Sequence, residues 1–166
     1  MCFRLARAED SGIEANSVDL VTVAQALHWF DIDAFMQEAG RVLKPGGVLA
    51  AWSYHHCRVS PQIDTVVEAV FAEVEAFWPP ERTLVENRYR DIRLPFAEIP
   101  AGEFCMQASW TADNMLDYMR TWSASQRYIA ANGKDPTEGY AGALQALWGA
   151  GNRAVRWPVI LRLGRK

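Results

Sequence analysis

Apolar and polar residues in the first third of the chain follow three successive patterns. Residues 18–24 are almost all apolar and mostly β-branched, which is typical of a strand buried on both faces. Residues 48–52 form a second apolar run. Between them, apolar side chains recur at the spacing of one helical face, at Ile32, Phe35, Met36, Ala39, Val42 and Leu43. This order predicts two parallel strands joined by a helix in a right-handed crossover.

The predicted helix has signals at both ends. Asp31 is a favourable N-cap residue, and Arg41 and Lys44 place positive charge near the carboxyl end of the helix dipole. Pro45 ends the helix, and the glycines at 46 and 47 allow a sharp reversal. A helix of about thirteen residues is about 20 Å long, which about six extended residues also span. The lengths of the three elements therefore agree.

The rest of the chain predicts further elements. Alternation of apolar and polar residues favours strands at residues 1–6, 104–110 and 155–163. Amphipathic helices are predicted from Pro61 to Val74, from Thr111 to Trp122 and from Asp135 to Trp148. No period persists between residues 81 and 102, and we interpret residues 58–103 as a cap over an active-site mouth.

Composition narrows the class of protein. The 166 residues are half hydrophobic and 22% charged, which is ordinary for one globular domain. A formal net charge of -3 disfavours nucleic acid and anionic membranes as partners. No apolar run approaches the roughly twenty residues of a transmembrane helix, and no secretory signal is recognisable. We therefore expect a cytoplasmic protein.

Cysteine and histidine positions predict neither a disulfide nor a metal site. Cys2, Cys57 and Cys105 are odd in number and far apart. His55 and His56 precede Cys57 directly, and adjacent residues of an extended segment point in alternating directions. Such a group cannot close around one ion, so we expect no bound metal.

Several short segments spread over nearly the whole chain carry a family resemblance. They are Ala8-Glu9-Asp10, Ser17-Val18-Asp19-Leu20-Val21, Ala26-Leu27-His28-Trp29-Phe30, Arg41-Val42-Leu43-Lys44-Pro45-Gly46-Gly47, Tyr118-Met119-Arg120-Thr121-Trp122-Ser123-Ala124 and Trp157-Pro158-Val159. Together they resemble class I S-adenosylmethionine-dependent methyltransferases. Within that superfamily they are most similar to the small-molecule branch that includes trans-aconitate methyltransferase.

The resemblance implies an α/β fold, namely an incomplete Rossmann-like class I methyltransferase fold. Its sheet would be mostly parallel with an antiparallel carboxyl-terminal strand. Residues 1–166 would form a single truncated domain, because the opening strand and glycine-rich turn of the family have no counterpart here. The strand at Ser17–Ala24 matches the fourth of the family, whose neighbour in the sheet is the absent first strand. We therefore expect an open edge there, covered by a homodimer contact or another association.

The same resemblance implies S-adenosylmethionine as cofactor and assigns four residues to it. The backbone N–H of Ala8 would face a nitrogen of the adenine ring, and the carboxylate of Glu9 would accept from the exocyclic amine. Gln25 and Ala26, after the first buried strand, would line the methionine side. The alternative for Glu9 is a solvated loop acid, which spacing alone favours.

The methyl acceptor decides what the protein must contribute. A carboxylate is already ionised and needs no base. The candidates for gripping its other carboxylates are Arg88, Arg90 and Arg93, with Tyr89 among them, and Trp29 would lie beside the substrate. An alcohol, amine or carbon acid needs a base, and His28 follows a strand end where open α/β sheets bind ligands. The alternatives are a solvated basic stretch for the arginines and, for His28, a hydrogen bond to the backbone.

We therefore expect S-adenosylmethionine-dependent methyl transfer to a small molecule, with carboxylates among the acceptor classes. The alternative is a non-catalytic remnant of the fold that acts as a dimerising or protein-interaction module. Titration with S-adenosylmethionine separates the two, because the enzyme hypothesis predicts binding once the missing amino-terminal part is supplied, whereas the alternative predicts none.

Overall fold

The computed structural model describes residues 3–166, which divide into two compact units. The sheet unit comprises residues 3–55, 81–104 and 159–166, and the helical unit comprises residues 56–80 and 105–158. The segment predicted as a cap, residues 58–103, is thus shared between the two units. That it covers an active site stays a prediction.

The sheet has the mixed topology that the resemblance implies. Its strand order is β1 (Val18–Ala24), β2 (Leu43–Tyr54), β5 (Arg153–Arg165) and β3 (Ala97–Ile99), and β4 (Phe104–Trp110) also pairs with β5. β1 and β2 are parallel, whereas β5 is antiparallel to both β2 and β3. The strands β1, β2 and β3 therefore share one direction, and the carboxyl-terminal strand opposes them.

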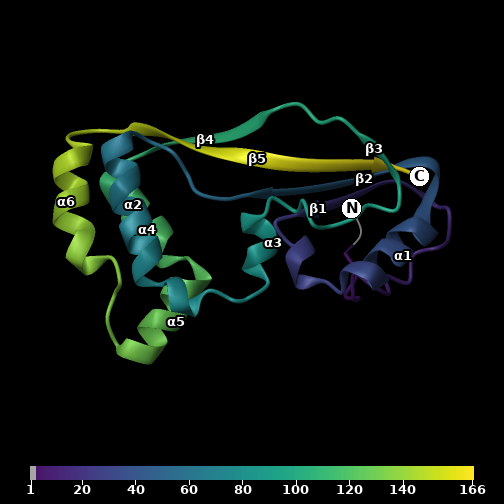
Figure 1. Ribbon diagram of the computed structural model, residues 1–166, viewed down its shortest axis with the longest axis horizontal. Coiled ribbons are helices and arrows are strands. Elements are labelled where there is room, and N and C mark those ends of the chain that lie inside the picture. The colour runs from purple at the N-terminus through teal and green to yellow at the C-terminus, as the bar shows by residue number, and fades with distance from the viewer. Residues whose placement is uncertain (1–2) are drawn as a thin grey trace. The chain divides into compact units, whose positions relative to one another are not determined.

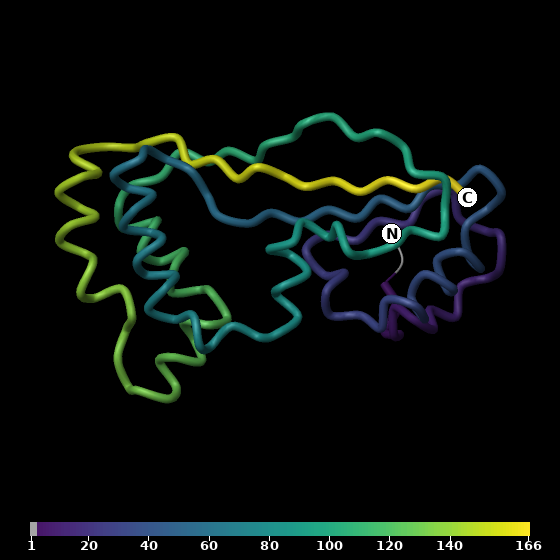
Figure 2. The backbone as a smooth tube through the Cα atoms, in the orientation of Figure 1, coloured from purple at the N-terminus to yellow at the C-terminus, as the bar shows by residue number. Residues whose placement is uncertain are grey.

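The predicted order of strand, helix and strand is confirmed, but the helix ends earlier than predicted, at Val42, and Lys44 and Pro45 already lie in β2. α1 (Ile32–Val42) begins after Asp31, whose side chain accepts from the Ala34 N–H at 3.1 Å. A short 3₁₀ helix, η1 (Leu27–Trp29), connects β1 to α1. Figure 2 shows the chain passing from β1 through α1 into β2. β2 is longer than the apolar run 48–52 because pairing with β1 already begins at Val18 and Leu43.

The core of the sheet unit lies where α1 and the segment after α3 (Arg82–Glu86) pack on the sheet, as Figure 1 lets the reader follow. Apolar side chains from the strands, η1, α1, α3 and the segment after α3 are buried together, among them Val23, Leu27, Phe35, Met36, Leu49, Ala51, Val85, Tyr89 and Leu94. Lys166, directly after β5, binds the carboxyl end of α1. Its ammonium donates to the carbonyl oxygens of Gly40 and Leu43 at 2.6 and 2.7 Å, which satisfies acceptors that the helix leaves free.

Two strand predictions are corrected. β1 is not buried on both faces: among its residues only Val23 is buried, and Leu20 is 55% exposed, because β1 stands at the end of the strand order. The strand predicted at residues 1–6 is not formed by residues 3–6, where Phe3 and Leu5 are exposed and unpaired with the sheet. Residues 1 and 2 lie outside the described part. An alternating pattern alone forms no strand without a neighbouring strand to pair with.

The helical unit contains α2 (Pro61–Glu73), η2 (Glu75–Phe77), α4 (Ala112–Arg120), α5 (Ser123–Asn132) and α6 (Glu138–Trp148). Both α2 and α4 pack against α6, and each of these helices buries a large side chain, namely Val67, Met115 and Trp148. The helices predicted after Ser60, Thr111 and Asp135 are present. α5 is absent from the prediction because its buried residues, Ala124 and Ser125, are small and form no apolar stripe. No helix within residues 3–166 is long and apolar enough to cross a bilayer.

Candidate functional site

The chain leaves β1 in a left-handed turn that the side chain of Gln25 fastens to β2. Gln25 has φ of 50°, and its backbone N–H donates to the Trp52 carbonyl at 2.9 Å. Its side-chain amide donates to the Tyr54 carbonyl at 3.2 Å and accepts from the Tyr54 N–H at 2.9 Å. The amide therefore aligns the carboxyl ends of the two parallel strands. Contact of Gln25 with a cofactor stays a prediction.

The next turn, η1, points its successive side chains in different directions. Leu27 and His28 are buried, at 1% and 7% exposure, whereas Trp29 is 52% exposed. The Trp29 N–H donates to the carbonyl of Ala26, which closes the turn. His28 therefore faces the interior of the sheet unit, and Trp29 remains available to a ligand.

The buried His28 is paired with Tyr89. Its Nδ1 lies 3.0 Å from the hydroxyl oxygen of Tyr89, which is fully buried. Burial lowers the pKa of His28, and the Arg82 guanidinium lowers it further, against a smaller opposing effect of Glu81. His28 is therefore neutral at neutral pH. Nδ1 has a side-chain partner 61 residues away, where the alternative interpretation expects a backbone partner for the ring.

A strained turn presents Tyr89 to His28. Arg88 and Tyr89 both have positive φ, 57° and 53°, which costs of order 1–3 kcal/mol per residue outside glycine. The Tyr89 N–H donates to the Leu84 carbonyl at 2.8 Å, and its carbonyl accepts from Nη1 of Arg162. Tyr89 thus points inward, whereas Arg88 and Arg90 on either side are exposed. The substrate roles of these arginines stay predictions.

Ala8 and Glu9 form a turn closed by the Asp10 N–H and the Arg7 carbonyl at 3.2 Å. Glu9 Oε1 accepts from the Asp31 N–H at 3.0 Å, and Arg7 lies 3.5 Å from Oε2. The pKa of Glu9 is lowered, first by its own backbone N–H and then by that of Asp31. Glu9 is therefore not the solvated loop acid of the alternative interpretation: it fastens this turn to the start of α1. Its carboxylate retains further acceptor sites for a ligand.

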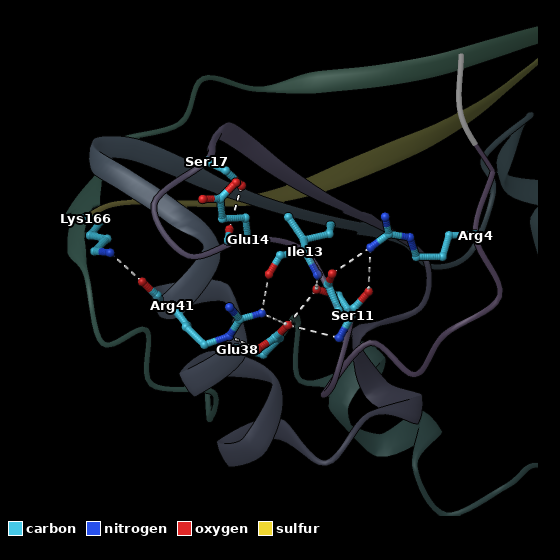
Figure 3. Close-up of polar contacts among 10 residues, drawn as sticks. Arg4, Ser11, Ile13, Glu14, Ser17, Glu38, Arg41 and Lys166 are labelled. Carbon is cyan, nitrogen blue, oxygen red and sulfur yellow. Dashed lines mark hydrogen bonds and ion pairs between the residues drawn. The ribbon is translucent and has the colours of Figure 1, made fainter.

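An ionic cluster that the sequence analysis missed holds the same segment against α1. Glu38 Oε1 accepts from the N–H and the hydroxyl of Ser11, at 2.9 and 2.6 Å. Arg41 donates through Nε and Nη2 to the two carboxylate oxygens, both at 2.7 Å, and Figure 3 shows Glu38 between these partners. The side-chain hydrogen bonds from Arg41 and Ser11 lower the pKa of Glu38 to about 2. The signal for this cluster in the sequence is Glu38, a charged residue next to the apolar positions of the predicted helix.

A cavity of about 270 Å³ runs along β1 inside the sheet unit. Residues 21–24 of β1 and the α1 residues Ala39 and Val42 line it, so the cavity lies between β1 and α1. Ala8 and Ala26, Phe30 and Phe35 form other parts of the wall, with Glu38 as the charged member. The structure thus brings the predicted cofactor residues Ala8 and Ala26 to one cavity, whereas the side chains of Glu9 and Gln25 are bonded elsewhere.

No group of three metal-ligating side chains gathers anywhere in residues 3–166. Cys57 is buried with its pKa raised by burial to about 12, and Cys105 is exposed; both are free thiols. Cys2 lies outside the described residues.

Comparison with known proteins identifies the family. A family model described as a methyltransferase domain matches residues 1–51. A solved structure from Anaeromyxobacter dehalogenans, a candidate type II methyltransferase, is 41% identical with a TM-score of 0.90, and the match covers 99% of this chain and 71% of that one. A candidate methyltransferase of Dictyostelium discoideum is 34% identical over 137 residues, which is 80% of this chain and 52% of the relative.

A candidate S-adenosylmethionine-dependent methyltransferase of Saccharomyces cerevisiae is 23% identical over 158 residues, 53% of its length. The chain thus spans about half the length of these curated relatives, at 52% and 53%. The close match to the Anaeromyxobacter structure extends over both compact units of the chain. The chain therefore belongs to the class I S-adenosylmethionine-dependent methyltransferases.

Proposed function

We propose that this chain takes part in S-adenosylmethionine-dependent methyl transfer to a small molecule and holds the adenine end of the cofactor in the cavity beside β1. One observation carries this: Ala8, expected at the adenine, and Ala26, expected at the methionine side, are eighteen residues apart and line the same largely apolar cavity beside β1. An apolar cavity with a few polar groups suits a planar heteroaromatic ring. The residues present therefore fit the adenine end of the cofactor.

The proposed roles of the chain are binding and positioning. The cofactor supplies the reactive methyl carbon, and the protein aligns the acceptor and excludes water. The turn at Ala8 and Glu9 is held on α1 by the Asp31 N–H and by the cluster of Ser11 and Glu38. The Gln25 amide fixes the strand ends beside it. A preformed wall of this kind lowers the entropic cost of binding the cofactor.

We propose a carboxylate-bearing small molecule as the methyl acceptor. Such an acceptor needs no general base. Burial lowers the pKa of His28, which makes its imidazole a weaker base than an exposed one. The exposed Trp29 offers an aromatic surface next to His28, with ring centroids 4.7 Å apart. Arg88 and Arg90 are candidates for gripping further carboxylates of the same molecule.

Binding of S-adenosylhomocysteine by isothermal titration calorimetry tests the cofactor site. We expect the wild-type chain to bind and the Ala26→Trp variant to bind at least about tenfold more weakly, because the indole would fill the cavity; tenfold corresponds to about 1.4 kcal/mol. Ala143→Trp, at an exposed position of α6, is the matched control and should bind like the wild type. Equal affinity of the Ala26→Trp and wild-type chains, or no binding by the wild type, would contradict the proposal.

We propose that a second copy of the chain covers the outer edge of β1. An edge strand presents a row of unpaired N–H and C=O groups, and Leu20 adds an exposed apolar side chain. Two identical edges paired antiparallel about a two-fold axis satisfy each other.

Size-exclusion chromatography with light scattering measures this association. We expect a concentration-dependent dimer for the wild type and a monomer for Leu20→Lys, since a charged side chain on an edge blocks strand pairing. Leu147→Lys changes an equally apolar, exposed residue on α6 and should leave the dimer intact. A wild-type chain that stays monomeric at all concentrations would overturn the proposal.

A further inference from the structure

We propose that Tyr89 fixes the tautomer of His28, so that the imidazole offers an N–H donor at Nε2 instead of a basic nitrogen. In this tautomer His28 binds an anionic oxygen and does not remove a proton from the methyl acceptor. The assignment of that oxygen to a carboxylate acceptor rests on the proposed function. The tautomer itself rests on contacts within the sheet unit.

A single hydrogen bond decides the tautomer. A neutral imidazole has one protonated nitrogen, which donates, and one bare nitrogen, which accepts. Nδ1 of His28 lies 3.0 Å from the Tyr89 hydroxyl, and both side chains are buried. If the phenol donates to Nδ1, the ring hydrogen must sit on Nε2. If Nδ1–H donates to the phenol, Nε2 is bare and can act as a base.

The phenol proton has one good acceptor in its surroundings. Burial raises the pKa of Tyr89 against smaller opposing effects of the His28 backbone N–H and the Ser53 hydroxyl, so the hydroxyl keeps its proton. The Ser53 oxygen is buried and reaches hydrogen-bonding geometry with no partner within residues 3–166. Nδ1 of His28 is therefore the acceptor within reach of the Tyr89 proton.

The opposite arrangement is unfavourable on the same contacts. With Nδ1–H as donor, the proton of a fully buried phenol would be left without an acceptor, which costs roughly 1–3 kcal/mol. With the phenol as donor, that bond is satisfied and Nε2–H is left for a ligand. Hydrogen bonding therefore selects the Nε2–H form.

Other contacts keep this pair in place. The Arg162 guanidinium binds the Tyr89 carbonyl through Nη1 and Glu98 through Nη2, the latter at 2.9 Å. The Tyr89 N–H is bonded to the Leu84 carbonyl at 2.8 Å. These bonds hold Tyr89 in a backbone conformation with φ of 53° that it would otherwise avoid. A strained backbone conformation at Tyr89 is expected to persist where it holds the hydroxyl in a functionally important position.

The fixed tautomer narrows the class of methyl acceptor. A neutral N–H donor next to the exposed Trp29 can bind a carboxylate oxygen, which is nucleophilic without deprotonation. It cannot accept the proton that an ammonium or alcohol must lose before methyl transfer. His28 thus binds the acceptor, and Tyr89 is a positioning residue that acts through it.

Long-range ¹⁵N–¹H correlation NMR of histidine-labelled protein reads the tautomer directly at pH 7. The chain has three histidines, and His28→Gln identifies the signals of His28. We expect a bare Nδ1 and a protonated Nε2 in the wild type, and a mixture of tautomers in Tyr89→Phe, which keeps the ring and removes the hydroxyl. Tyr128→Phe removes a hydroxyl bonded to Glu73 in the helical unit and should leave the His28 signals unchanged.

The outcomes separate the two proposals. A bare Nε2 or a doubly protonated ring in the wild type overturns the inference, and this holds whether or not Tyr89→Phe folds. Citrate as a carboxylate probe should shift the Nε2–H signal, whereas ethylenediamine should not; the reverse response overturns the proposed acceptor class. Neither measurement requires cofactor, so failure to bind S-adenosylhomocysteine would contradict only the proposed cofactor site.

Discussion

Replacing Glu38 by glutamine is expected to lower the free energy of unfolding by roughly 2 kcal/mol at pH 7, because an ionised carboxylate with a pKa near 2 loses its charge-assisted bonds. The lowered pKa also predicts the pH dependence. The stabilisation is present above the ordinary pKa of 4.5 and is lost as pH falls from about 4.5 to about 2. Urea unfolding at pH 7 and pH 3 measures both effects.

The Glu38→Gln variant should therefore be less stable than the wild type at pH 7 and closer to it at pH 3. Glu14→Gln removes an exposed carboxylate from the same amino-terminal segment and should change the free energy of unfolding by no more than about 0.5 kcal/mol. An unchanged difference between Glu38→Gln and wild type across this pH range would contradict the assigned role. Because Glu38 holds Ser11, the variant should also bind S-adenosylhomocysteine more weakly.

Replacing Trp148 by alanine is expected to destabilise the helical unit by about 3–5 kcal/mol. Trp148 is 1% exposed, and its Nε1 donates to the Trp110 carbonyl at 3.2 Å. The variant loses the packing of a large aromatic side chain and leaves that carbonyl without its donor. Urea unfolding gives the magnitude, and hydrogen exchange locates it.

The loss of exchange protection should concentrate in residues 56–80 and 105–158, which form the helical unit. Leu147→Ala, at the neighbouring exposed position of α6, should have a small effect and serves as the control. If Trp148→Ala unfolds the sheet unit to the same extent, the two units form one cooperative structure and the localisation is wrong. Glu38→Gln reports on the other unit, so the two variants together measure how far the units are coupled.

Local elements were predictable because their signals lie within a few residues of each other. Asp31 caps α1 through a residue three positions away, and the helical stripe repeats every three or four residues. Thr111 and Asn114 form a capping box at the start of α4 in the same local way. The segments that resemble methyltransferases are also local, and they led to the family that the comparisons establish.

The contacts of the candidate site were not predictable from spacing. The Tyr89 hydroxyl reaches His28 across 61 residues, and Ser11 reaches Glu38 across 27. Both pairs form only when separate segments pack on the same sheet. The resemblance identified Ala8 and Ala26 as cofactor residues, and the structure places both in one cavity. The structure also shows that the side-chain amide of Gln25 is hydrogen-bonded to the backbone of Tyr54.

The order of residues therefore determined the strand, helix and strand around α1, the helices that begin after Ser60, Thr111 and Asp135, and the family of the chain. Tertiary structure decided that β1 has one neighbour and leaves Leu20 exposed, that residues 3–6 form no strand, and that His28 meets a phenol. The physical reason is the range of the interactions. Helix periodicity and capping act within one or two turns, whereas burial, strand pairing and side-chain partners depend on which distant segments arrive at the same place.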